Sequence, residues 1–265
     1  MDYLDRLENE SINIIREACY QFRDVAMLWS VGKDSTTLLW LIRKALRGTI
    51  PFPVIHIDTG RKFPEMYEYR DRLAREWGLP LIVGRNEEEI ARGMGPKKGL
   101  KLDCCTELKT NALRQVIGKY GFKAVFLGAR RDEHGLPAME WPFPLRDERF
   151  PWSDEVQPAD TGNPFRSFWF EDEPYRVHPM LHFSELDVWR YIKREAIPVI
   201  SLYFSREGKR YRSIRCVPCC SPVDSPAATL DEIIQEIRTS EPPVRPGRAR
   251  NSESVCTMET FRALD

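Results

Sequence analysis

Six consecutive residues, Ser30-Val31-Gly32-Lys33-Asp34-Ser35, are of the types that a phosphate-binding turn needs. They separate a short apolar run at 25–29 from an apolar helical segment at 36–46. The free N–H groups and the dipole at the start of a helix bind anionic oxygens, and a glycine lets the backbone approach them closely. The G-x-x-x-x-G-K-S/T spacing of a Walker A loop is absent. The run therefore predicts a phosphate site of another type, with a plain strand–turn–helix as the alternative interpretation.

Two more polar turns follow apolar runs further along the chain. One is Asp58-Thr59-Gly60, after a run at 53–57, and the other is Gly128-Ala129-Arg130-Arg131, after a run at 124–127. Both turns are polar and contain glycine, as residues 30–35 do. Both turns are therefore candidates for the same site as residues 30–35.

The seven cysteines are unevenly placed along the chain. Cys104 and Cys105 are adjacent, and residues 216–220 read Cys-Val-Pro-Cys-Cys. In a reducing compartment, clustered cysteines indicate metal binding or catalysis more often than a structural disulfide. The clusters therefore predict a second kind of chemistry besides phosphate binding.

The elements that must position these residues alternate between strand and helix. The predicted strands are 25–29, 53–57, 79–83 and 124–127, and the predicted helices are 5–22, 36–46, 64–77, 106–119, 184–195 and 229–238. This alternation indicates an α/β fold, a doubly wound parallel sheet with right-handed crossovers. Because ligands bind beyond the carboxyl ends of parallel strands, we expect the three polar turns to converge.

Three regions follow from the pattern: an N-terminal helix (1–24), a main domain (25–200) and a C-terminal region (201–265) with cysteines and an Arg-rich tail. Residues 134–175 lack periodicity, so we interpret them as an irregular insertion that forms a lid or contacts a partner. The basic stretch 206–215 would suit a nucleic acid or a partner protein, with a solvated surface as the alternative. The C-terminal region thus carries both cysteines and positive charge.

Composition excludes several classes of protein. The 265 residues are 42% hydrophobic, and 40 Lys plus Arg balance 40 Asp plus Glu. Such a chain is too apolar and too weakly charged to be mainly disordered, and its neutrality weighs against non-specific coating of nucleic acid. No window is long and apolar enough to span a membrane, and the first residues lack the features of a signal peptide. We therefore expect a cytoplasmic protein.

Together, the three turns resemble the motifs of the PP-loop ATP pyrophosphatases, which cleave ATP between its α- and β-phosphates. Residues 30–35 are similar to the PP-loop itself, residues 56–67 to the adenylate-binding segment, and residues 128–133 to the second phosphate-contacting turn. Within that superfamily, residues 25–238 most resemble the small subunits of bacterial sulfate adenylyltransferases. The resemblance implies a PP-loop domain over 25–200, with ATP and Mg²⁺ as ligands.

The resemblance also implies a role for each matching residue. Backbone amides at 31–35, with Ser30 and Ser35, would hold the β- and γ-phosphates, and Lys33 would neutralise them. Asp34 would bind Mg²⁺ or orient the loop. Arg130 and Arg131 would stabilise charge on the α-phosphate, with surface salt bridges as their alternative role. The implied ATP-binding residues are Ser30, Val31, Gly32, Lys33, Asp34, Ser35, Asp58, Gly60, Arg130 and Arg248, although the tail around Arg248 departs from the family pattern.

The cysteine clusters resemble a different branch of the superfamily. Sulfate-activating subunits do not ordinarily carry both clusters, whereas adenylylsulfate reductases hold a 4Fe–4S cluster with a similar set. That resemblance implies Cys104, Cys105, Cys216 and Cys219 as the cluster ligands, with zinc or buried free thiols as alternatives. The roles of Cys220 and Cys256 stay open.

Four functions remain under consideration. The first is adenylation of an acceptor oxyanion for iron–sulfur-dependent sulfur incorporation, as in DNA phosphorothioation or nucleic-acid thiolation, with a cysteine desulfurase or another sulfur donor as partner. The alternative is a sulfate adenylyltransferase small subunit, which forms adenylyl sulfate with a GTPase large subunit. Adenylylsulfate reduction is a lesser alternative, because Cys256 lacks the Gly-Leu-His flank of the reductase. A nucleotide-binding redox sensor is the last.

Overall fold

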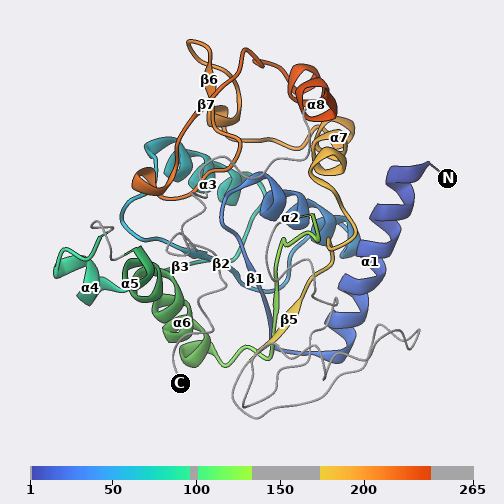
Figure 1. Ribbon diagram of the computed structural model, residues 1–265. Coiled ribbons are helices and arrows are strands. Elements are labelled where there is room, and N and C mark those ends of the chain that lie inside the picture. The colour runs from blue at the N-terminus through green and yellow to red at the C-terminus, as the bar shows by residue number, and fades with distance from the viewer. Residues whose placement is uncertain (1, 96–100, 133–173, 240–265) are drawn as a thin grey trace, which may run out of the picture.

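The computed structural model describes residues 2–95, 101–132 and 174–239 of the chain (Figure 1). Most of the insertion predicted at 134–175 and the tail from residue 240, with Arg248 and Cys256, lie outside these residues. No helix within the described part of the chain is long and apolar enough to cross a bilayer.

Five parallel strands form the central sheet, in the order β3-β2-β1-β4-β5 (Figure 1). Their bounds are β1 Val25–Leu28, β2 Val54–Ile57, β3 Leu81–Gly84, β4 Ala124–Phe126 and β5 Tyr175–Val177. Strands β1 and β4 are buried at every position, because helices cover both faces of a parallel sheet. The doubly wound α/β fold predicted from the sequence is confirmed.

Helices on the two faces of the sheet separate the apolar core into two clusters. The helices are α1 Tyr3–Gln21, α2 Lys33–Ala45, α3 Pro64–Glu76, α4 Glu87–Ala91, α5 Lys101–Cys105, α6 Ala112–Tyr120, α7 Glu185–Glu195 and α8 Leu230–Thr239. Met27 of β1 packs into the larger cluster with α1, α2, α3 and α7, whereas its neighbours Ala26 and Leu28 face the smaller cluster with α6. Successive strand residues point to opposite faces, so β1 serves both clusters.

The structure adds elements that the sequence pattern did not predict. The predicted helix at 106–119 begins with a π-helical turn, η1 Thr106–Asn111, which follows α5 directly. Strand β5 extends the sheet at the end of the predicted insertion, and a small hairpin pairs β6 Lys209–Arg210 with β7 Val223–Asp224. Two short 3₁₀ turns, η3 Ser201–Tyr203 and η4 Val217–Cys219, complete the C-terminal region. Helix α2 begins at Lys33, so half of the predicted phosphate-binding turn is its first turn.

Candidate functional site

The turn between β1 and α2, residues 30–35, is held by its own side chains. The hydroxyls of Ser30 and Ser35 lie 3.0 Å apart, and Ser35 also donates to the carbonyl of Gly32 over 3.2 Å. Val31 adopts a left-handed backbone with φ of 69° and is buried. A β-branched residue is a genuine outlier there, and such strain persists only where the surroundings enforce it. Contacts within the protein therefore determine the shape of this turn, which is called the phosphate loop below.

Gly128, just after β4, lies directly against the phosphate loop. A Cβ atom at this position would come within 3.0 Å of both the backbone N and the Cα of Ser35. Real Cβ atoms rarely approach backbone so closely, so only glycine fits without a shift of the loop. The polar turn predicted at 128–131 thus contacts the one predicted at 30–35.

Tyr203 of η3 reaches the phosphate loop from the C-terminal region. Its buried hydroxyl accepts a hydrogen bond from the backbone N–H of Lys33 over 2.8 Å. We expected all amides of residues 31–35 to face phosphate oxygens. For the amide of Lys33 the structure differs, because the tyrosine hydroxyl takes the place that an anion would occupy.

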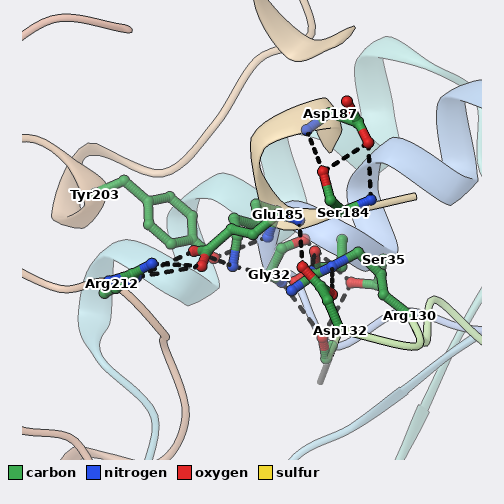
Figure 2. Close-up of polar contacts among 12 residues, drawn as sticks. Gly32, Ser35, Arg130, Asp132, Ser184, Glu185, Asp187, Tyr203 and Arg212 are labelled. Atoms are coloured by element: carbon green, nitrogen blue, oxygen red, sulfur yellow. Dashed lines mark hydrogen bonds and ion pairs between the residues drawn. The ribbon is translucent and has the colours of Figure 1, made fainter. Parts of the chain in front are cut away.

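Side chains from four parts of the chain form a network of charges beside the phosphate loop (Figure 2). Lys33 Nζ lies 3.3 Å from Asp34 Oδ2 and 3.5 Å from Glu185 Oε1, at the start of α7. Arg130 pairs with Asp34 and, over 2.8 Å, with Asp132. The network consists of Lys33, Asp34, Arg130, Asp132, Glu185 and Arg212, and we call it the loop network.

Glu185 joins the loop network to the C-terminal region. Its backbone N–H donates to Asp132 Oδ2 over 2.6 Å, and Arg212 Nη2 donates to its Oε2 over 2.9 Å. Burial alone would raise the pKa of Glu185. The positive charges of Lys33 and Arg212 have the larger, opposite effect, so the pKa falls to about 2. The carboxylate is therefore ionised at neutral pH.

The turn after β2 presents a second carboxylate at the same edge of the sheet. Asp58 is buried, and its Oδ1 accepts hydrogen bonds of 2.8 Å from the N–H of Gly60 and from the hydroxyl of Tyr67. Arg85 Nε lies 3.5 Å from Asp58 Oδ2. The carboxylate is thus fixed in orientation, as a ligand-binding group must be.

The structure brings some of the predicted residues together and separates others. Ser30, Lys33, Asp34 and Arg130 meet at the phosphate loop. The side chain of Arg131 is exposed, and its backbone N–H donates to Leu181 O over 3.1 Å. Arg248 lies outside the described residues, so its predicted role stays a prediction.

Sequence reasoning did not identify four residues of this site: Asp132, Glu185, Tyr203 and Arg212. The predicted helix 184–195 includes Glu185 and the basic stretch 206–215 includes Arg212, but neither pattern indicates a contact with the phosphate loop. Two arginines of that stretch in fact point inward, since Arg210 is buried against Glu236 and Arg212 pairs with Glu185. These two are not available to a nucleic acid or a partner protein.

The two cysteine clusters meet at one pocket beside the turn after β2. Its lining consists of Thr59, Arg61, Cys104, Cys105, Lys109, Cys216, Pro218 and Cys219. Thr59 Oγ1 lies 3.2 Å from Cys216 Sγ, and the N–H of Val217 donates to Arg61 O over 2.8 Å. The structure therefore places all four predicted ligands around one pocket. Thr59, which also lines it, directly follows Asp58 in the sequence.

The thiols of this pocket are not all equivalent. Cys104, Cys216 and Cys219 are free, whereas Cys105 is disulfide-bonded. Burial raises the pKa of Cys216, but Lys62, Lys109 and the contact with Thr59 outweigh it, so the net pKa is lowered. Within the described residues, no group of three or more side chains is arranged as a ready metal site.

Comparison with known proteins places the chain among related sequences and folds. A family model described as the phosphoadenosine phosphosulfate reductase domain matches residues 24–222. A relative from Alkalilimnicola ehrlichii, named sulfate adenylyltransferase subunit 2, is 39% identical over 97% of this chain and 91% of its own. A relative of the same name from Colwellia psychrerythraea is 38% identical over 98% of this chain and 97% of its own.

Solved structures agree at the level of the fold. A phosphoadenylyl-sulfate reductase from Candida auris, crystallised as a phosphate complex, superposes with a TM-score of 0.57. The match covers 83% of this chain and 98% of that one, at 20% sequence identity. The parallel sheet and its helices are therefore common to both proteins.

Proposed function

The chain belongs to the phosphoadenosine phosphosulfate reductase domain family and is an adenylyl-transferring enzyme, and we propose that it activates sulfate. In the proposed reaction, a sulfate oxygen attacks the α-phosphorus of ATP. The bond to the bridging oxygen breaks, adenylyl sulfate forms, and pyrophosphate leaves. We further propose that a GTPase large subunit is the partner, as the resemblance to the small subunits implies.

Nearly full-length similarity carries this proposal. The two relatives named sulfate adenylyltransferase subunit 2 align with 97–98% of the chain at 38–39% identity. The loop network and Gly128 lie within the family match at 24–222. The proposal therefore accounts for the whole described chain, whereas a function based on the cysteines alone accounts for one pocket.

The site offers a group for each requirement of the reaction. Lys33 and Arg130 supply positive charge for the triphosphate, which is the main need of adenylyl transfer. Asp34 is a fitting ligand for the Mg²⁺ that accompanies ATP, because its carboxylate oxygens lie at the loop and its side chain is 19% exposed. When bound, Mg²⁺ would offset phosphate charge.

The test is sulfate-dependent release of pyrophosphate from ATP, with the GTPase large subunit present. Adenylyl sulfate and pyrophosphate should form in equal amounts, and Lys33→Gln should reduce the rate at least about tenfold, as removal of a charge-stabilising group does. Formation of ADP and orthophosphate would refute the proposal, because those products require attack at the γ-phosphorus.

A second candidate function is iron–sulfur-dependent sulfur incorporation, in which the adenylated acceptor is a nucleic acid. The convergence of four cysteines on one pocket favours it. Cys104, Cys105, Cys216 and Cys219 would hold a 4Fe–4S cluster or zinc, provided that Cys105 is reduced. A cysteine desulfurase or a similar sulfur donor would then be the partner.

Metal analysis of protein purified without oxygen separates the two candidates. About four iron and four acid-labile sulfide per chain, lost in Cys104→Ser but kept in Cys19→Ser, would support the cluster. Cys19 is the matched control because it is a free thiol in α1. Stoichiometric zinc without iron would show that the cysteines bind zinc and would refute the iron–sulfur-dependent function. Sulfate activation that survives Cys104→Ser would favour the first function.

A further inference from the structure

We propose that Glu185 is a positioning residue that competes with phosphate for Lys33 and thereby limits how tightly the enzyme holds pyrophosphate. The inference rests on the proposed function, in which the phosphate loop receives the β- and γ-phosphates of ATP. Glu185 would thus set how fast the pyrophosphate product is released.

Glu185 is a fixed anion in this arrangement. Arg212 holds its Oε2 with Nη2 at 2.9 Å and Nε at 3.2 Å, and the backbone N–H of Glu185 is bound to Asp132. Figure 2 shows Glu185 between Arg212 and the phosphate loop. The carboxylate therefore stays in place whether or not a phosphate arrives.

Lys33 is the partner that can change its contacts. Its ammonium lies 3.5 Å from Glu185 and 3.3 Å from Asp34, longer than ordinary charged hydrogen bonds of about 2.7–2.9 Å. A lysine ammonium carries three rotatable donors on a flexible four-carbon stem, so a contact with a carboxylate at such a distance can be exchanged for one with a phosphate oxygen. A phosphate oxygen can therefore draw Lys33 away from Glu185 without disturbing Arg212.

The charges of the loop network set the direction of the effect. Within the described part of the chain, the network joins three cations (Lys33, Arg130, Arg212) to three carboxylates (Asp34, Asp132, Glu185). A phosphate must compete with carboxylates for each cation and is repelled by them. The side chains of Lys33 and Glu185 are only 6% and 14% exposed, so water screens this repulsion weakly.

Neutralising Glu185 should therefore tighten the binding of pyrophosphate. Glu185 stabilises the state in which Lys33 binds no phosphate. By linkage, Glu185 lowers the affinity of Lys33 for phosphate by the same factor by which a bound phosphate weakens the contact between Lys33 and Glu185. Product release limits turnover in many enzymes, so a tighter pyrophosphate complex should also slow the reaction. Loss of this carboxylate is thus expected to raise affinity and lower kcat together.

The test is calorimetric titration of the full chain with inorganic pyrophosphate and, separately, with AMP, at constant Mg²⁺. Glu185→Gln should bind pyrophosphate about tenfold more tightly, within the range known for coupled sites. It should bind AMP like the wild type, because AMP has no β- or γ-phosphate. Arg212→Gln should bind pyrophosphate more weakly. Without Arg212, Lys33 is the main cation that pairs with Glu185, so a phosphate displaces it less easily.

Glu195→Gln is the matched control, since Glu195 lies on the same helix with a side chain that is 17% exposed and pairs with Lys44. It should leave both affinities unchanged. Partial unfolding cannot produce a gain in affinity, so equal or weaker pyrophosphate binding by Glu185→Gln overturns the inference. A wild type that binds pyrophosphate but forms no adenylyl sulfate would instead overturn the proposed function and leave the role of Glu185 standing.

Discussion

At the level of single residues, the phosphate loop is stabilised by groups that lie far from it in the sequence. The backbone N–H of Lys33 donates to Tyr203, and its ammonium contacts Glu185. Strained Val31 is enclosed among buried apolar side chains. The loop therefore keeps its shape through tertiary contacts more than through its own composition.

Tyr203→Phe tests the most direct of these contacts. Without the hydroxyl, the N–H of Lys33 loses its acceptor, and a buried unpaired donor costs about 1–3 kcal/mol of the free energy of unfolding. Urea denaturation measures this loss. Tyr120→Phe, at a tyrosine that is 47% exposed, should change stability by less than about 0.5 kcal/mol. Equal stability of both variants would show that the contact contributes nothing.

His56 predicts a pH dependence of stability. Burial is the main cause that lowers the pKa of its ring from 6.5 to about 4, and the ring lies 2.9 Å from the carbonyl of Trp29. Between about pH 6.5 and pH 4, His56 is protonated in the unfolded chain but stays neutral in the folded protein. The contribution of His56 to the free energy of unfolding is therefore fully present above pH 6.5. It is lost on acidification, by on the order of 3 kcal/mol in total.

The measurement compares this slope with that of His56→Asn, whose side chain does not titrate. The variant should lose some stability at every pH, because the smaller side chain leaves a cavity. Its free energy of unfolding should nevertheless fall less steeply between pH 6.5 and pH 4. Identical slopes in the two proteins would contradict the assignment.

At the level of elements, the site depends on how closely β4 and α2 approach each other. Gly128→Ala would place a methyl group 3.0 Å from the backbone of Ser35, so the phosphate loop must move. We expect a loss of about 1–3 kcal/mol in stability and weaker binding of pyrophosphate, measured by thermal unfolding and calorimetry.

Gly118→Ala is a control of opposite sign. Gly118 lies within α6, and a Cβ there would meet no other atom within 4 Å. Alanine favours helix over glycine, so stability should rise by about 0.5–1 kcal/mol with unchanged pyrophosphate binding. A Gly128→Ala protein that matched the wild type in both measurements would mean that the two elements do not determine the shape of the loop.

The elements also show which features the sequence could predict. Strands β1 and β4 are continuous apolar runs because both of their faces are covered, and β2 is apolar except for His56. The cap of α7 at Ser184 follows from its residue type. Strand β5 has three residues, Tyr175–Val177, and exists through its pairing with β4. The contact of Glu185 with Lys33 joins residues far apart in the chain, and no local pattern encodes such a contact. The fold and the meeting of Lys33, Asp34 and Arg130 were therefore predictable, whereas the contacts of Glu185 and Arg212 in the loop network were not.

At the level of the whole molecule, the carboxylate of Glu8 in α1 binds three side chains of the main domain at once. Glu8 Oε2 accepts from Lys44 of α2 over 2.7 Å, and from Arg194 and Tyr191 of α7 over 2.8 Å and 2.6 Å. Figure 1 shows α1 running along one side of the molecule. The region predicted as a separate N-terminal helix is thus part of the same core, with Ile14, Ile15 and Ala18 buried.

Glu8→Ala should therefore destabilise the whole fold and not α1 alone. The change leaves two cations and a hydroxyl without their common acceptor, and the side chain of Glu8 is only 15% exposed. We expect a loss of about 2–3 kcal/mol in a single cooperative transition, since removal of one partner from a poorly solvated group of charges is costly. Glu10→Ala, on the same helix with a side chain that is 58% exposed, should cost less than about 0.5 kcal/mol. A separate early unfolding transition in Glu8→Ala, with the main transition unchanged, would instead mean that α1 unfolds independently of the main domain. Pyrophosphate binding would then survive the unfolding of this helix.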